Sequence, residues 1–186
     1  MTNNNDLGPL ALLVGKWRGG SGKDIAPEPD GVEDNAYYET LEFSVVGDVS
    51  NAEIQTLETV QYEQVVRRQS NDKLLHHQIG YFTWDPDKQI VCNGFTIPRR
   101  VAVLAGGTVT NNGSKTIFDV SATLGSDDWA IVESGFMAGN ASTRSFKQML
   151  CVEGDSLMYE QMMLVDIYGK KSFEHSDKNT LSRVLS

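Results

Sequence analysis

The feature that most constrains this 186-residue chain is the alternation between short β-type runs and clusters of turn-forming residues. Turns built on Gly, Asn, Asp, Ser and Pro recur roughly every ten residues, a spacing typical of all-β domains. The runs between them cover residues 39–46, 53–67, 74–84, 89–97, 101–110, 115–124, 129–134, 143–152, 157–168 and 179–185. Links this short join antiparallel neighbours, because a parallel crossover needs a dozen or more residues. The sequence therefore predicts an all-β fold of about ten antiparallel strands.

A closed up-and-down barrel is the architecture that these strands favour, since closure leaves no unpaired strand edge. In the run "LMYEQMMLVDIY", residues 157–168, apolar side chains fall on both faces of the strand. An antiparallel barrel with an apolar cavity inside and a homodimer contact outside has this pattern, and so does the core of a sandwich. No internal repeat or linker divides the chain, so we expect a single domain over residues 1–186.

Two stretches depart from the strand pattern. The stretch "DLGPLALLVG" has helical spacing, in which Asp6 suits an N-cap, Pro9 a first turn and Gly15 the end of a short helix. We expect this helix near one end of the barrel, with residues 1–7 flexible. Residues 23–35, "KDIAPEPDGVEDN", are expected to form the one loop without secondary structure.

Charge and hydropathy argue against several classes of partner. A formal net charge of −9 and a pI near 4.7 disfavour nucleic acid or an anionic membrane surface. No run approaches the ~20 apolar residues of a transmembrane helix, and the N-terminus lacks the basic and apolar regions of a signal peptide. We therefore expect a cytoplasmic protein in which Cys92 and Cys151 are reduced core thiols.

The stretch "VGKWRGGSGKD", residues 14–24, has the composition of a phosphate-binding loop but not its spacing. Counting back from the Gly-Lys pair at 22–23, the first glycine position of a P-loop holds Trp17, and the hydroxyl position holds Asp24. A carboxylate at that place repels phosphate. The dinucleotide fingerprint G-x-G-x-x-G is also incomplete, so the stretch does not predict a nucleotide site.

Trp17 instead carries a resemblance to a superfamily of barrels. A short N-terminal turn followed by Gly-x-Trp at the start of the first strand is similar to the calycins, which include lipocalins and fatty-acid-binding proteins. In those folds the tryptophan closes one end of the barrel against an arginine of the last strand, and Arg183 in "LSRVLS" has that place here. The resemblance implies a buried Trp17 close to Arg183, a contact that contributes about 1–2 kcal/mol when partly desolvated.

More specifically, the chain resembles the nitrobindin family of heme-binding barrels over residues 8–186. The motifs that carry the resemblance are "GKWRGGSG", "LLHHQIGYF" and "FEHSDKNTLSRV", in the family's order. Two features depart from the family pattern. Ser21 holds the last glycine position of G-x-W-x-G-x-G, with Gly22 one residue late, and the loop at 24–35 is long. With "TIPRRVAVLAGG", these features suggest a bacterial branch of the family.

The resemblance implies heme b as the cofactor and His175 as its axial ligand. Neutral imidazole is a good iron ligand, and a single axial histidine leaves the other face of the heme open to a small gas. The segment "EHSDKN" is also rich in turn formers, so the sequence alone leaves open a solvated His175 at a loop tip. The resemblance places His76 and Gln78 in the cavity, whereas His77 faces the other way because strand side chains alternate.

The pair Arg99 and Arg100 is the last candidate feature. Pro98 before it suggests a strand edge, a bulge or a barrel corner. If the strand continues, the two arginines point in opposite directions, and we assign Arg99 to a heme propionate or a fatty-acid carboxylate. An arginine at such a place is also commonly a surface charge. No nucleophile elbow G-x-S-x-G occurs, and three histidines make a weak case for a bare metal site.

Two functions follow from these observations. The first is heme binding, for which the resemblance implies nitric oxide binding or isomerisation of peroxynitrite to nitrate on ferric heme. The second is a non-catalytic carrier of a fatty acid or another small hydrophobic ligand, since barrels of this size enclose one such molecule. A barrel filled by side chains, acting only through its surface, is a third alternative.

The position of His175 can be predicted from strand geometry. On one regular strand His175, Asp177, Asn179 and Arg183 share a face. Eight residues at ~3.3 Å each place His175 roughly 26 Å from Arg183. We therefore predict a partly accessible His175 far from Trp17, beside the mouth of the main cavity, with Asp177 and Asn179 hydrated on the same face.

Overall fold

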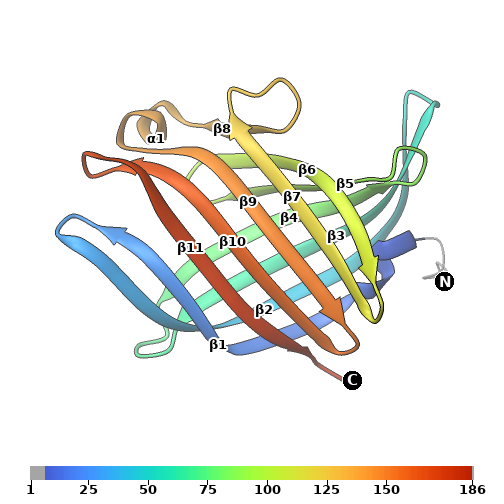
Figure 1. Ribbon diagram of the computed structural model, residues 1–186, viewed down its shortest axis with the longest axis horizontal. Helices are drawn as coiled ribbons and strands as arrows, with labels where there is room; N and C mark the ends of the chain where they lie inside the picture. The colour runs from blue at the N-terminus through green and yellow to red at the C-terminus, as the bar shows by residue number, and fades with distance from the viewer. Residues whose placement is uncertain (1–6, 186) are drawn as a thin grey trace.

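The computed structural model describes residues 7–185, which form a closed barrel of eleven β-strands (Figure 1). The strands are β1 Gly15–Glu28, β2 Gly31–Asn51, β3 Gln55–Arg68, β4 Leu74–Asp85, β5 Ile90–Ile97, β6 Val101–Asn112, β7 Lys115–Leu124, β8 Ala130–Glu133, β9 Ala141–Glu153, β10 Ser156–Ile167 and β11 Lys170–Arg183. A 3₁₀ helix, η2, spans Gly8–Leu12, and a short α-helix, α1, spans Gly135–Asn140.

Neighbouring strands follow the order β1-β11-β10-β9-β7-β8-β6-β5-β4-β3-β2, which closes on β1. The prediction of an all-β closed barrel is confirmed, but the prediction of ten purely antiparallel strands is wrong. The short strand β8 pairs antiparallel with the start of β6 and parallel with the end of β7. The remaining parts of β6 and β7 pair with each other directly. β8 therefore fills the place where these two strands part.

The strand missing from the ten predicted runs is β1, whose second half, from Lys23, lies in the residues expected to be a loop. Pairing continues from Lys23–Ala36 to Glu28–Gly31, so β1 and β2 form one long hairpin. No residue from 23 to 34 is buried, so the hairpin lacks the buried alternate positions by which a strand is recognised in a sequence. Figure 1 shows this hairpin and the β10–β11 hairpin at one end of the barrel, with η2 and the last residues of β11 at the other.

The N-terminal helix is a five-residue 3₁₀ turn rather than the expected helix of regular type, with Pro9 in its first turn as predicted. Its hydrogen bonds run three residues back, from the N–H groups of Leu10 and Leu13 to the carbonyls of Leu7 and Leu10. All three leucines are buried. Leu7 is therefore anchored in the core, and the rest of the segment expected to be flexible, residues 1–6, lies outside the described residues.

Trp17 and Arg183 close this end of the barrel, as the resemblance implied. They are paired residues of β1 and β11. Trp17 has no exposed surface, and the Arg183 guanidinium lies 4.0 Å from the centre of its ring. The guanidinium also donates hydrogen bonds to the carbonyls of Leu12 and Val14, while the indole N–H donates to the carbonyl of Leu13 at 2.8 Å. One side chain thus joins the last strand to the turn that precedes the first.

We expect Arg183→Ala to lower the free energy of unfolding by about 2–4 kcal/mol. The change removes the cation–π contact, two hydrogen bonds to backbone carbonyls and the ion pair with Asp155. Urea denaturation measures this loss. Arg144→Ala is the matched control, since it removes an ion pair with Asp166 from a half-exposed arginine and should cost at most about 1 kcal/mol. Equal losses in the two variants would contradict the role of Arg183.

Candidate functional site

His175 lies toward the end of the barrel opposite Trp17. On β11 it stands eight residues from Arg183, the partner of Trp17, which corresponds to roughly 26 Å of strand. It shares the inward face with the buried Asn179 and Leu181, and its side chain is 25% exposed. The prediction of a partly accessible, inward-facing His175 far from Trp17 is confirmed.

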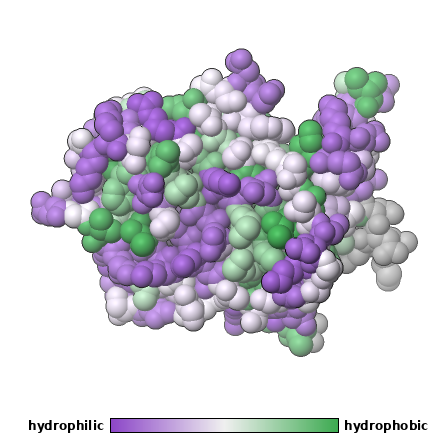
Figure 2. Space-filling view, in the orientation of Figure 1, coloured by the Kyte–Doolittle hydropathy of each residue, from purple (hydrophilic) through white to green (hydrophobic). Residues whose placement is uncertain are grey.

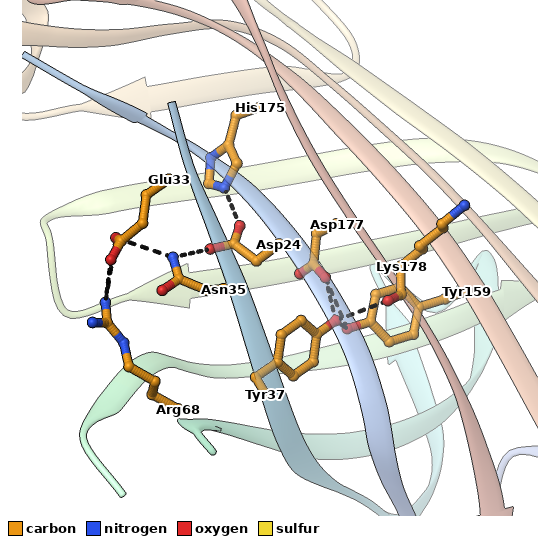
Figure 3. Close-up of polar contacts among 9 residues, drawn as sticks. All are labelled: Asp24, Glu33, Asn35, Tyr37, Arg68, Tyr159, His175, Asp177 and Lys178. Atoms are coloured by element: carbon orange, nitrogen blue, oxygen red, sulfur yellow. Dashed lines mark hydrogen bonds and ion pairs between the residues drawn. The ribbon is translucent and has the colours of Figure 1, made fainter. Parts of the chain in front are cut away.

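A row of polar contacts holds His175 in place (Figure 3). Its Nε2 lies 2.8 Å from Oδ1 of Asp24, a residue of the β1–β2 hairpin. The other carboxylate oxygen of Asp24 accepts from Asn35 at 3.2 Å, and the same amide group donates to Glu33. Glu33 in turn pairs with Arg68 on β3 at 3.1 Å. The Asp24 carboxylate accepts a hydrogen bond from Nε2 of His175, so Nε2 carries the ring proton. Nδ1 of His175 is then the nitrogen without a proton, which is free to bind a ligand.

His76 begins a second chain of hydrogen bonds, which runs across the barrel interior. Its Nε2 lies 3.0 Å from Oε1 of Gln78, whose amide N–H donates to the Tyr62 hydroxyl. Tyr62 donates to Asn93, and Asn93 donates to Gln148, each at 2.9 Å. Since Gln78 uses its N–H group toward Tyr62, its oxygen accepts from His76. The proton of a neutral His76 ring is thereby placed on Nε2, and Nδ1 is an acceptor.

The predicted site residues His175, His76 and Arg99 share one region of the barrel. Burial lowers the pKa of His76, and the charges of Arg99 and His175 act in the same direction, while Asp24 opposes them. Charges change the pKa of a group only at short range, so Asp24, His175 and Arg99 all lie near His76. They come from β1, β11 and the β5–β6 turn, whereas His76 is on β4. His77 points outward and pairs with Glu63 at 2.8 Å, as strand alternation predicted.

Arg99 and Arg100 do not continue a strand. β5 ends at Ile97, and residues 98–100 form a turn in which the Arg100 N–H donates to the Ile97 carbonyl at 3.2 Å. Arg100 has a positive φ of 62°, and both arginines are exposed. The condition for opposite side-chain directions, a strand that continues through the two arginines, is therefore not met. Pro98 instead lies at the corner between β5 and β6, one of the alternatives that the sequence left open.

A buried polar cluster that the sequence did not reveal lies below His175. Glu39 accepts hydrogen bonds from Gln64 at 2.7 Å, from Asn179 at 2.7 Å and from Tyr159 at 3.0 Å. Tyr37 contacts the Tyr159 hydroxyl at 2.7 Å and also donates to Asp177. Asp177 and Asn179 were expected to be hydrated on the inward face. Asn179 is instead buried, and both find protein partners.

Gly22 shows why the glycine of the first motif comes one residue late. Between Gly19 and Gly22 a β-bulge adds one residue to β1 relative to β2. The bulge brings Gly22, rather than Ser21, opposite Tyr37. A Cβ atom at Gly22 would lie 2.0 Å from the Tyr37 ring, so only glycine leaves room for this ring. The departure from the family motif is therefore accommodated by the backbone.

The cavities of the structure differ from the expected open interior. A cavity bounded by Tyr62, Gln64 and Tyr159 inside the barrel measures about 10 Å³, room for a single water. A cavity of about 700 Å³ lies instead on the outer side of β4 and β5, and no histidine lines it. The prediction that His175 stands beside the main cavity is therefore wrong, because His175 does not line this larger cavity. Cys92, expected in the core, lines it as a free thiol.

Fold and site together define a β-barrel with two inward histidines, His76 and His175, of which His175 is backed by the carboxylate of Asp24. The sequence matches the family described as "THAP4-like, heme-binding beta-barrel domain" over residues 6–183, and the chain belongs to this family. Heme, the cofactor expected from the sequence, is the cofactor for which the family is described.

Among solved structures, the crystal structure of Rv2717c from M. tuberculosis resembles this chain with a TM-score of 0.71 and 21% sequence identity. The match covers 97% of this chain and 100% of that one, and at this identity it shows the fold alone. No curated protein matches the sequence. Within residues 7–185, no helix is long and apolar enough to cross a membrane.

The pKa of Asp177 generates a prediction about stability. Burial raises this pKa to about 7, and the Glu39 and Asp24 carboxylates act in the same direction, against the Tyr37 hydrogen bond and the charge of His175. A carboxyl group whose pKa is raised by folding stabilises the fold below its unfolded pKa of about 4, and this contribution is lost as pH rises through about 7.

We therefore expect Asp177→Asn, which keeps an acceptor for Tyr37, to be more stable than the wild type by about 2–4 kcal/mol at pH 8. At pH 4 the difference should nearly vanish, because the native carboxyl group is then neutral. Urea unfolding of both proteins at the two pH values provides the measurement. A difference that does not change with pH would show that Asp177 does not titrate in this range.

Proposed function

We propose that the protein binds heme b at the end of the barrel opposite Trp17, with His175 as the ligand of the iron. The observation that carries this proposal is the hydrogen bond between His175 Nε2 and Asp24. A histidine that ligates a metal usually donates its second ring N–H to a carboxylate or a carbonyl, which fixes the tautomer and raises the basicity of the ligand. Asp24 is placed for that role, and Nδ1 is left for the iron.

A heme site suits these residues better than a bare metal site. The porphyrin contributes four nitrogens, so the protein needs to supply only one side chain. Within residues 7–185, no group of three or more His, Cys, Asp or Glu side chains is arranged to hold a metal ion. One inward histidine is enough for heme, whereas zinc or iron held by protein alone needs at least three ligands.

Three further residues would surround the cofactor. His76 offers Nδ1 as a hydrogen-bond acceptor, because Gln78 holds the proton on Nε2. Gln78 acts through His76 by fixing its ring, and is itself fixed by Tyr62. Arg99 is exposed near the same groups, where its guanidinium suits the bidentate binding of a propionate.

The activity that we propose is chemistry on nitrogen oxides, in which heme supplies an iron that binds nitric oxide and, when ferric, isomerises peroxynitrite to nitrate. The protein's own part would be to supply one ring nitrogen of His175, held by Asp24, as the iron ligand. The protein would also offer Nδ1 of His76 as a hydrogen-bond acceptor to an incoming nitrogen oxide. The sequence resemblance to nitrobindins supports this proposal. A cytoplasmic location and a homodimer stay predictions.

The fatty-acid carrier, our alternative from the sequence, is not favoured in the barrel interior. The cavity among Tyr62, Gln64 and Tyr159 has the volume of one water, and the buried polar groups around it already bond to one another. An acyl chain there would separate these pairs without replacing their hydrogen bonds, at a cost of about 1–3 kcal/mol for each group left unpaired.

His175→Ala should weaken heme binding by at least about 100-fold, because it removes the only protein ligand that we assign to the iron. Titration of the purified apoprotein with hemin, followed by the shift of the Soret band, measures the affinity. His77→Ala is the matched control, since His77 faces outward toward Glu63 and should bind heme as the wild type does. Heme binding that survives His175→Ala unchanged would refute the proposal.

Asp24→Asn should weaken heme binding by about 10–100-fold and raise the reduction potential of the bound heme, since the neutral amide makes His175 a less basic ligand. Spectroelectrochemical titration measures the potential without reference to any catalytic activity. Asp34→Asn serves as control, because Asp34 lies on the same hairpin but pairs with Lys23 at the surface. Identical potentials in the wild type and Asp24→Asn would contradict the positioning role of Asp24.

A further inference from the structure

The cavity of about 700 Å³ outside the barrel wall, which we call the outer groove, is separate from the histidines. Its floor consists of β4 and β5 side chains that alternate with the inward-facing ones, among them Tyr81, Thr83 and Cys92. The far part of the β2–β3 hairpin forms one wall, and Trp129, in the loop before β8, forms the other. The groove therefore uses the outer face of the barrel wall.

The backbone builds the outer groove through two local features. A β-bulge at Gly47, which has a φ of +101°, interrupts the register of the β2–β3 hairpin. Gln55 donates to Asp85 at 2.7 Å, which fixes the end of this hairpin beside the β4–β5 turn (Figure 1). On the opposite wall Trp129 packs against Gly106, where a Cβ atom would lie 2.0 Å from the ring. Both walls are thus held by specific contacts.

Large apolar side chains in the outer groove remain in contact with solvent. Val46, Tyr81 and Leu104 line it and are each exposed by 47–48%. A contiguous apolar hollow costs free energy in water until something covers it. By contrast, the face shown in Figure 2 is largely hydrophilic, with smaller apolar patches. The volume of the groove lies within the range of about 300–1,000 Å³ typical of small-molecule sites.

The outer groove is polar near one end. Lys88, in the β4–β5 turn, is the one cationic side chain that lines it, and within residues 7–185 it makes no ion pair of 4 Å or less. Its charge does act on the carboxylate of Asp85, which also lines the groove. The neighbouring Asp85 has its oxygens occupied by Gln55 and by two backbone N–H groups of the turn. The other end, at Leu104 and Trp129, is apolar.

The groove has the length of a medium-chain ligand. It follows β4 and β5 from the paired residues Asp85 and Ile90 to the paired residues Tyr81 and Gly94. Four residues of strand span about 13 Å, which matches an extended hydrocarbon of about ten carbons.

We propose that the outer groove binds an elongated amphipathic molecule of the fatty-acid class, with its anionic head group at Lys88 and its hydrocarbon chain along Cys92 toward Leu104 and Trp129. The lining where the chain would lie is mostly apolar, with Thr59 and Thr83 beside Cys92, and its one cation stands where the head group would lie. This site goes beyond heme binding and does not depend on it, since neither His175 nor His76 contributes to the groove.

The test compares decanoate with 1-decanol, which share a ten-carbon chain and differ in the charge of the head group. Isothermal titration calorimetry of the full chain should show binding of both probes. Bromodecanoate, brominated at the terminal carbon, should quench the fluorescence of Trp129, and Trp129→Phe should abolish that quenching. The other tryptophans, Trp17 and Trp84, are buried and do not line the groove.

Two variants separate the parts of the site. Gly94→Leu, which adds a side chain beside Leu104 on the groove floor, should weaken both probes by at least about tenfold. Lys88→Glu should weaken decanoate by about tenfold while leaving 1-decanol within about twofold of the wild type. Met162→Glu, an exposed apolar position on β10, is the control and should change neither affinity.

The urea unfolding of each variant is also measured, so that a folding defect is detected separately from the loss of the groove. Wild-type-like unfolding with the two expected losses supports the proposal. Absence of binding of both probes to the wild type overturns it, and so does binding that Gly94→Leu leaves unchanged. Equal effects of Lys88→Glu on decanoate and 1-decanol would overturn the assignment of an anionic head group.

Discussion

The contact between Arg183 and Trp17 sets the register on which the candidate site depends. It joins the end of β11 to the start of β1. Beyond a β-bulge between Arg18 and Lys23 the two strands pair again, with Asp24 opposite Asp177 and beside His175. A slip of one residue would turn every side chain of β11 to the other face, and His175 would leave the interior. Closure of the barrel at Trp17 thereby positions His175, the proposed ligand of the heme iron, near the opposite end.

The buried polar cluster explains why the two ends have different character. Glu39 receives three hydrogen bonds from protein donors, although burial raises its pKa. A network whose members satisfy one another tolerates a low dielectric, whereas a partly satisfied one does not. The cluster therefore separates the apolar plug around Trp17 from the region of His175 without requiring a ligand of its own.

Much of the fold could be predicted from the sequence, because most strands bury every second residue and are followed by turns that contain Gly, Asn or Asp. The β1–β2 hairpin beyond Lys23 could not, since it lies outside the core and buries nothing before Asn35. His175, His76 and Gln78 were predicted as site residues through family motifs. Asp24, the partner of His175, was missed because it lies in the supposed loop, 151 residues from His175. Glu39 and Tyr37 were missed because a strand pattern does not show which polar residues meet across a barrel.

The wall of a barrel is one strand thick, and β4 uses both of its sides. Gln78 faces inward and holds His76, while Tyr81 faces outward into the outer groove. Because alternate residues of one strand point into different surroundings, the two faces can acquire different ligands without sharing a side chain. Any coupling between them must then pass through the backbone pairing of β4 with β5. That pairing is unbroken from Ile79–Thr96 to Asp85–Ile90, so the groove floor behaves as a rigid platform and the two sites are expected to act independently.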